Sequence, residues 1–361
     1  MANWGMILFL VVFVLLYGAM NHYVLNKVYK TFEFNKNKYY NLYILWALAT
    51  FSYIIASYFS GKYYNGFTEG FMLFASLWMG MVFLFTIAFA VYDLLRWTLG
   101  MGSANILFGF IIAVVLVTIF SIYTVNHITT KTITLHSDKV TEELRIAHLS
   151  DLHIGSTQGP QFLDKVAAKT NALQPDIVLI TGDLIDGPHK YPDDALSKLD
   201  AIKVPMYVSI GNHEEYAGRS LVDRLLKQTA ITLLSNEKQS LRGLGVDLIA
   251  IDDAENRNQV AGVLANIPVN KSKYTILMYH RPTGHDDAAR SGIDLMLSGH
   301  THNGQIWPFH YITGAFVQPL TGLHTYGNMT LYVSQGTGWW GPPMRLGSQN
   351  EIVLIRILPK K

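Results

Sequence analysis

The chain has 361 residues, of which 50% are hydrophobic and only 15% are charged, too apolar a composition for a wholly soluble protein. A formal net charge of +2 leaves no basic surplus for holding a nucleic-acid backbone, so we expect no nucleic-acid partner. The sequence has no cysteine, which excludes disulfides, zinc-finger ligand sets and thiol nucleophiles.

Four apolar runs without charged residues occupy the first third of the chain, at residues 4–20, 39–59, 71–92 and 106–125. Each approaches the ~20 residues that a helix needs to cross a bilayer. The sequence therefore predicts a transmembrane region over residues 1–130 with four helices. A cleaved signal peptide is the competing interpretation of the first run, but no Lys or Arg precedes it and three more runs follow. Spans without charges favour an anchoring role over a transporter.

An even number of spans places the N-terminus and the C-terminal part on the same side of a membrane. Loops on the opposite side carry five basic residues, and the side of the termini carries three near the spans. The five are Lys27, Lys30, Lys36, Lys38 and Arg96, and the three are Lys62, Lys131 and Lys139. Because basic loops tend to stay cytoplasmic, the count predicts an extracytoplasmic C-terminal domain, with a cytoplasmic domain as the alternative.

Residues 131–361 change to short apolar runs separated by helical stretches and turn residues. Strands are predicted at 145–149, 177–180, 206–210, 246–251, 274–279, 293–297, 330–334 and 351–357, and helices at 161–173 and 195–202. This alternation predicts one α/β domain in which two stacked β-sheets are flanked by helices.

Polar side chains follow five of these strands directly. In chain order they are Asp151 and His153, then Asp183, then Asn212 and His213, then His280, and finally His300 and His302. Residues two apart at a strand end point the same way, and open α/β sheets bind ligands at the carboxyl ends of their strands. Each group alone is common by chance, but the ordered set predicts one shared metal site.

The ordered set resembles the calcineurin-like metallophosphoesterase family, whose pattern is Asp-x-His, Gly-Asp, Gly-Asn-His-Asp/Glu, His and Gly-His-x-His. The resemblance covers roughly Ile146 to Ile355, and residues 299–305 and 338–345 are most similar to a membrane-associated bacterial branch with N-terminal transmembrane helices. It implies a metallophosphoesterase β-sandwich with two metal ions. Asp151, His153, Asp183 and His302 would hold one ion, and Asp183, Asn212, His280 and His300 the other. It also implies that Asp183 bridges the ions and that the catalytic His213 lies beside the leaving group.

The ligand atoms in this set are all oxygen or nitrogen, which suits Mn, Fe or Zn, and the resemblance favours Mn. Two adjacent ions activate a water and hold phosphoryl oxygens, so the predicted reaction is hydrolysis of a phosphate ester, phosphodiester or pyrophosphate. A catalytically silent, membrane-anchored metal-binding module is the alternative. His213 disfavours it, because metal binding alone does not require this residue.

Six aromatic residues lie between the last ligand group and the C-terminus, in segments predicted as loops: Trp307, Phe309, Tyr311, Phe316, Trp339 and Trp340. They form either an apolar patch for acyl chains or the bilayer surface, or a cover for the edge of the second sheet. Together with the four spans, they favour a lipid-linked or membrane-associated phosphate substrate and membrane lipids as partners. Arg345 is a candidate phosphate contact, because guanidinium matches phosphate geometry. Asp186, Asp252 and Asp253 are expected to be turn or surface carboxylates.

Overall fold

A computed structural model describes residues 4–32, 39–254 and 259–360 of the chain. The chain forms two compact units. One comprises Met1–Tyr123 together with Gly341–Met344, and the other comprises Thr124–Trp340 together with Arg345–Lys361. Four apolar helices precede an α/β domain with two mixed sheets, so the predicted fold class is confirmed.

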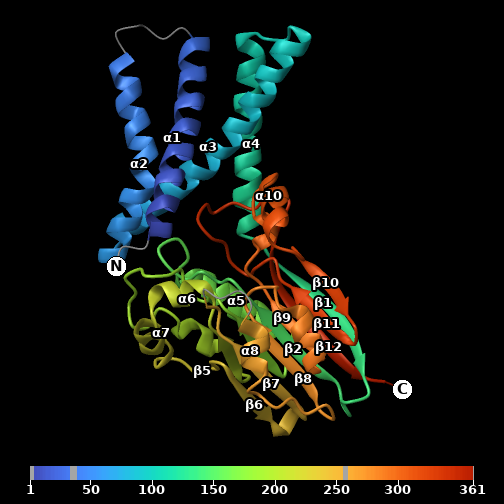
Figure 1. Ribbon diagram of the computed structural model, residues 1–361. Helices are drawn as coiled ribbons and strands as arrows, with labels where there is room; N and C mark the ends of the chain where they lie inside the picture. Colours follow the sequence, from blue (N-terminus) through green and yellow to red (C-terminus); the bar gives the residue numbers. More distant parts are fainter. Residues whose placement is uncertain (1–3, 33–38, 255–258, 361) are drawn as a thin grey trace. The chain divides into compact units, whose positions relative to one another are not determined.

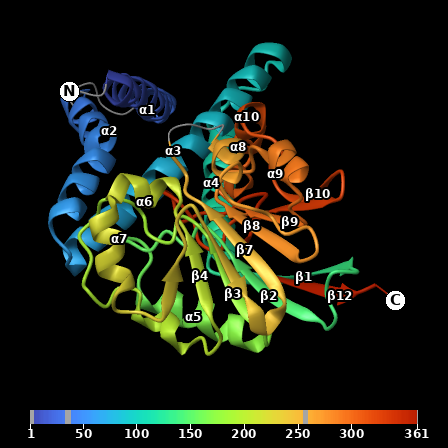
Figure 2. The ribbon, with the colours of Figure 1, turned by 60° about the horizontal axis from the view of Figure 1, so that its bottom comes forward.

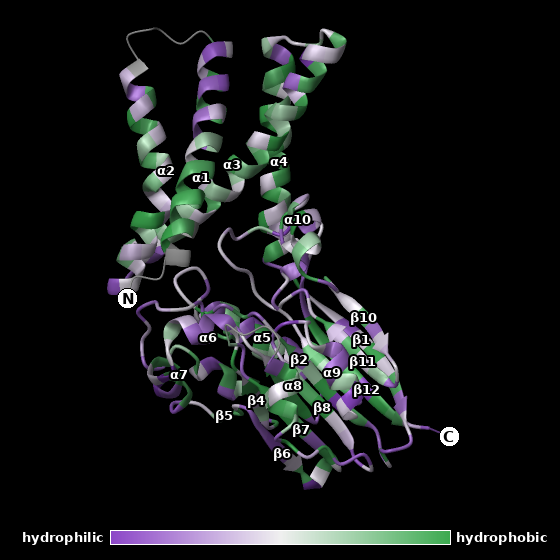
Figure 3. Ribbon diagram, in the orientation of Figure 1, coloured by the Kyte–Doolittle hydropathy of each residue, from purple (hydrophilic) through white to green (hydrophobic). Residues whose placement is uncertain are grey.

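The first unit contains the four long helices of Figure 1: α1 (Trp4–Thr31), α2 (Tyr39–Lys62), α3 (Gly66–Leu99) and α4 (Ala104–Val125). By length and composition, all four are able to cross a membrane, and Figure 3 shows their predominantly hydrophobic character. Three of them, α1, α2 and α3, extend past the end of the charge-free run that each contains. Charged residues therefore lie near the helix ends, where Lys27 of α1 pairs with Asp93 of α3.

Twelve strands of the second unit form two six-stranded sheets. The first has the order β1 (Ile128–Ser137), β12 (Asn350–Pro359), β2 (Leu144–Leu149), β3 (Ile177–Thr181), β4 (Met206–Ser209) and β5 (Ile231–Leu233). The second has the order β10 (Gly322–Tyr326), β11 (Met329–Val333), β9 (Leu295–Ser298), β8 (Tyr274–Tyr279), β7 (Val246–Ile251) and β6 (Glu237–Leu241). Strands β2 to β5 run parallel, as do β7, β8, β9 and β11. Their carboxyl ends are therefore grouped at one edge of each sheet.

Three apolar layers hold this unit together. Side chains such as Ile146 and Leu248 fill the space between the sheets. The outer face of the first sheet packs against α5 (Pro160–Ala172), the 3-10 helix η2 (Ser197–Ala201) and α7 (Arg219–Leu226). The outer face of the second sheet packs against α8 (Gln259–Leu264) and α9 (His285–Ser291), as Figure 2 shows. Burial on both faces explains why the central strands are continuously apolar.

Several local elements differ from the predicted ones. Strand β1 was not predicted because it is threonine-rich and half exposed, and it pairs only with β12 at the edge of its sheet. The predicted loop after the last ligand group contains α10 (Phe309–Phe316), and the predicted helix at 195–202 is the shorter η2. The remaining short helices are α6 (Asn212–Ala217), η3 (Arg242–Leu244) and η4 (His302–Gly304).

Candidate metal centre

The five polar groups meet at the carboxyl ends of β2, β3 and β4 of the first sheet and of β8 and β9 of the second. Several contacts between described residues join the sheets at this edge, among them two hydrogen bonds. The Nδ1 atom of His280 lies 2.8 Å from the carbonyl oxygen of Thr181, and the backbone N–H of His300 donates to Asp151 Oδ1 over 3.0 Å. Residues more than a hundred positions apart are thereby held in one buried site.

Five of the seven predicted ligand residues have a left-handed backbone. Their φ values are 53° at Asp151, 47° at His153, 52° at Asp183, 71° at His300 and 49° at His302. This conformation is unfavourable for residues other than glycine and persists only where the surrounding structure enforces it. Ligand atoms of all five residues lie in the groups of candidate metal ligands.

The first group of ligand atoms comes from Asp151, His153 and His302. The two Nε2 atoms lie 3.0 Å apart, and Asp151 Oδ1 lies 3.4 Å from His302 Nε2 and 4.0 Å from His153 Nε2. Metal bonds of about 2.0–2.2 Å place neighbouring tetrahedral donors roughly 3.3 Å apart. The spacing of the three atoms therefore fits one small divalent ion.

The second group of ligand atoms comes from Asp183, His280 and His300. Here His280 Nε2 lies 3.1 Å from Asp183 Oδ2 and 3.1 Å from His300 Nδ1. The same Oδ2 lies 3.7 Å from His153 Nε2, so Asp183 stands between the two groups. Among the described residues, the buried Oδ1 of Asn212 has no hydrogen-bond partner, and a metal ion would satisfy it. These observations fit a pair of ions that share Asp183.

Hydrogen-bond partners fix the ring protons of two histidines. His153 Nδ1 lies 3.2 Å from Asp186 Oδ1, and His280 Nδ1 faces the Thr181 carbonyl. Because carboxylate and carbonyl oxygens only accept, each Nδ1 carries the hydrogen and each Nε2 keeps a lone pair. This is the tautomer that metal binding through Nε2 requires.

Asp186 was expected to be a turn or surface carboxylate, and that expectation is wrong. Its Oδ1 faces His153 and lies 3.3 Å from His213 Nδ1, while its Oδ2 lies 3.5 Å from His189 Nε2. Burial opposes ionisation of Asp186, but hydrogen bonds from these histidines outweigh it and hold its pKa well below the usual range. No sequence signal distinguished Asp186, because its role depends on a partner 33 positions away.

Burial and neighbouring charges oppose each other at His213 and Asp183. Burial alone lowers the pKa of His213, but the charge of Asp183 and the Asp186 carboxylate raise it to about 9. Burial alone raises the pKa of Asp183, but the charges of His280 and His213 hold it well below the usual range. The two carboxylates therefore favour the protonated form of His213, and the neighbouring rings favour the ionised form of Asp183.

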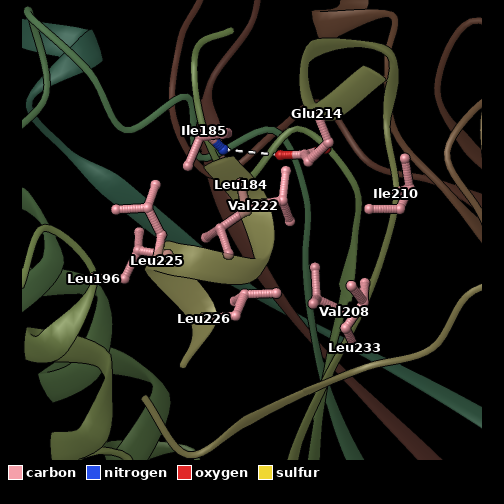
Figure 4. A pocket seen from close by; sticks show the side chains of 10 residues that line it. All are labelled: Leu184, Ile185, Leu196, Val208, Ile210, Glu214, Val222, Leu225, Leu226 and Leu233. Atoms are coloured by element: carbon pink, nitrogen blue, oxygen red, sulfur yellow. Dashed lines mark hydrogen bonds between the residues drawn. The ribbon is translucent and has the colours of Figure 1, made fainter. Parts of the chain in front are cut away.

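Glu214 fixes the two loops that carry Asp183 and Asn212. Its carboxylate accepts the backbone N–H groups of Asp183 (2.8 Å), Ile185 (2.9 Å) and Gly211 (2.8 Å). Figure 4 shows this side chain against apolar neighbours that line a cavity of about 10 Å³. That volume holds about one water, so the cavity belongs to the core and not to a ligand site.

The placement of Arg345 contradicts the predicted phosphate contact. The side chain is 0% exposed, and its N–H groups face five protein oxygens and the Nδ1 atom of His302 at 3.1 Å. The acceptors are the carbonyls of His302 (2.8 Å), Gln335 (2.8 Å) and Gly338 (2.6 Å), Asn350 Oδ1 (2.8 Å) and Ser348 Oγ (3.3 Å). No donor is left for a phosphate, so Arg345 acts as a buried clamp around the His302 backbone.

Asp253 also differs from expectation, because it is buried and forms an ion pair of 2.7 Å with Arg281. Asp252 remains a partly exposed turn carboxylate that accepts a hydrogen bond from Asn236. Neither carboxylate belongs to any of the three groups of candidate ligand atoms among the described residues, the third of which combines His153, Asp183 and His213.

Five of the six aromatic residues after the last ligand group are exposed: Trp307, Phe309, Tyr311, Phe316 and Trp340. Only Trp339 is buried, and its ring packs 5.5 Å from that of Phe162. Every residue of α10 is at least partly exposed. These five rings are therefore not a buried cover for the second sheet.

Several relatives are similar to more than half of this chain. An uncharacterized metallophosphoesterase of Campylobacter jejuni is 38% identical over 242 residues, covering 64% of this chain and 63% of its own length. A transmembrane protein with metallophosphoesterase domain of Bos taurus is 33% identical over 232 residues, covering 59% of this chain and 52% of the relative. The uncharacterized metallophosphoesterase YkoQ of Bacillus subtilis is 31% identical over 233 residues, covering 60% of this chain and 84% of the relative.

The chain thus spans less than two thirds of the Campylobacter and Bos taurus relatives, and most of the Bacillus one. The family model of the calcineurin-like phosphoesterases matches residues 144–304, the segment that contains every ligand residue described above. The chain belongs to the calcineurin-like phosphoesterase family.

Proposed function

We propose that the chain is a membrane-anchored phosphoesterase that holds two divalent metal ions and hydrolyses a phosphate ester, phosphodiester or pyrophosphate. The position of Asp183 between two groups of ligand atoms is the observation that carries this proposal. Bound ions at these positions would supply an activated water and stabilise the charge on phosphoryl oxygens.

The proposed ligands follow the two groups. Asp151, His153, Asp183 and His302 bind one ion, and Asp183, Asn212, His280 and His300 bind the other. The donor set is compatible with Mn, Fe or Zn, and we favour Mn. The hydrogen bonds of His153 and His280 orient these two rings for metal binding through Nε2.

His213 is the proposed general acid. Its Nδ1 faces Asp186, which leaves Nε2 to reach a leaving-group oxygen. Burial opposes protonation of the ring, but the charges of Asp183 and Asp186 raise its pKa and so favour the form that can donate a proton. Asp186 supports this role by fixing the ring orientation.

We propose a lipid-linked or membrane-associated substrate. Four helices able to cross a membrane support this proposal, and only two residues separate α4 from β1 of the catalytic unit. So short a tether raises the effective concentration of any phosphate carried by a lipid. The exposed rings of α10 supply apolar surface for such a substrate. The loop charges support an extracytoplasmic catalytic unit.

The test uses the full chain in detergent, stripped of metal and reloaded separately with Mn, Fe and Zn. An aryl phosphate, an aryl phosphodiester and a lipid extract are offered, and product release is measured together with metal content. We expect turnover by the wild type, loss of both metals and nearly all activity in Asp183→Asn, and a fall of about 10²–10⁴ in turnover at unchanged metal content in His213→Ala.

Near-normal metal content together with near-normal turnover in Asp183→Asn would contradict the shared-ligand assignment. A metal-loaded wild type that hydrolyses nothing and behaves like His213→Ala would instead favour a metal-binding module without turnover.

A further inference from the structure

Two exposed aromatic rings lie beside the proposed general acid. The ring of Tyr216 is 5.6 Å from that of His213, and the ring of Trp340 is 6.1 Å from it. Tyr216 is 62% exposed and Trp340 is 49% exposed, whereas His213 Nδ1 is buried toward Asp186. The rings therefore lie on the open side of His213.

A helix carries one of these rings, and two hydrogen bonds hold the segment that carries the other. Tyr216 follows His213 by three residues on α6, so both side chains lie on one face of the helix. The backbone N–H of Trp340 donates to Gln305 Oε1 over 3.0 Å, and Gln305 Nε2 donates back to the Trp340 carbonyl over 2.8 Å. Gln305 follows the proposed ligand His302 by three residues, so Trp340 is fixed to the loop of the metal centre.

We propose that Tyr216 and Trp340 form a leaving-group subsite for an apolar group, either a hydrocarbon chain or an aromatic ring, bonded to the scissile oxygen. This inference rests on the proposed function. Hydrolysis breaks the bond between phosphorus and the leaving oxygen and forms one between phosphorus and the water oxygen. The leaving oxygen takes the proton from His213 Nε2 and departs as an alcohol, so the group attached to it must lie on the open side of His213.

The chemistry of the two rings selects this class of leaving group. Tyrosine and tryptophan offer large apolar faces that lose little conformational freedom on binding. Neither ring carries a charge, and an anionic or strongly hydrated leaving group would lose water against them without a compensating contact.

Equilibrium binding of phosphonates tests the subsite without turnover, because a carbon atom stands in for the scissile oxygen. Methylphosphonate, butylphosphonate and benzylphosphonate are titrated calorimetrically into the metal-loaded full chain in detergent. We expect butyl- or benzylphosphonate to bind about tenfold tighter than methylphosphonate. A preference for butyl indicates a hydrocarbon chain, and a preference for benzyl indicates an aromatic ring.

Matched variants separate the rings from the fold. Tyr216→Ala and Trp340→Ala should each lose most of the preference and still bind methylphosphonate normally, whereas Tyr216→Phe and Trp340→Phe should keep it. Glu215→Ala, an exposed neighbour on α6, should match the wild type. No apolar preference in the wild type, or a full preference in both alanine variants, would overturn the subsite. Because binding needs no turnover, failure of the phosphoesterase assay leaves this result interpretable.

Discussion

Glu214→Gln tests whether one carboxylate holds the loops of the metal centre. One oxygen of Glu214 accepts the N–H groups of Asp183 and Gly211, and the other accepts that of Ile185. Glutamine keeps one oxygen but places an NH₂ group at the other position. At least one buried backbone N–H then faces a donor, although the side chain keeps its size.

The magnitude follows from the lost acceptor. An unpaired buried donor costs about 1–3 kcal/mol, and 1 kcal/mol shifts the melting temperature of a domain of this size by about 2–4 °C. We therefore expect Glu214→Gln to lower the melting temperature by about 3–10 °C. Glu214→Ala leaves three N–H groups unpaired and should cost more, about 4–5 kcal/mol. Metal affinity should fall about tenfold in the glutamine variant, because Asp183 loses its backbone support.

The assay follows tryptophan fluorescence of the detergent-solubilised full chain during heating, with metal content measured in parallel. Glu215→Gln is the matched control, because Glu215 is the exposed neighbour on the same helix. A Glu214→Gln variant with the stability and metal affinity of the control would refute the reasoning.

Three further predictions address the core, the close approach of two loops and the membrane orientation. Burial lowers the pKa of His148 from 6.5 to about 3. Below pH 6.5 the unfolded chain therefore binds a proton at His148 that the folded chain does not bind. The stability that is present above pH 6.5 is lost as the pH falls toward 3. His148→Gln should reduce the fall in unfolding free energy between pH 7 and pH 4 by up to about 3 kcal/mol in urea titrations; unchanged pH dependence would count against it. A Cβ at Gly211 would clash with Asp183 Oδ1, so Gly211→Ala should lower metal content at least about tenfold. Gly243 has open space around it, so Gly243→Ala should not lower metal content. Equal metal content in the two variants would contradict this expectation. Protease added to intact cells should release the catalytic unit, and a unit cleaved only after lysis would reverse the proposed orientation.

The strand ends of the site were predictable because each ligand group follows a local pattern. A short apolar run that ends in Asp, Asn or His marks a buried strand and its polar carboxyl end within a few residues, as at Asp183 after β3. The order of the groups then indicated one shared site. The four apolar helices were predictable for the same reason, since composition within each segment is sufficient.

Features that depend on distant contacts were not predictable. Asp186 meets His153 and His213 only after β2, β3 and β4 are placed side by side. Arg345 matched a phosphate ligand by residue type, but its burial arises from carbonyls of two other loops. The left-handed backbone at Asp151 and His300 is imposed by packing and opposed by the intrinsic preference of each residue.

Asp186 Oδ1 faces both His153, a proposed metal ligand, and His213, the proposed general acid. In the proposed enzyme, this shared atom makes ion occupancy and proton supply depend on the same negative charge. Exchanging one bound element for another would then displace the alkaline limb of the pH–rate profile as well as change the maximal rate.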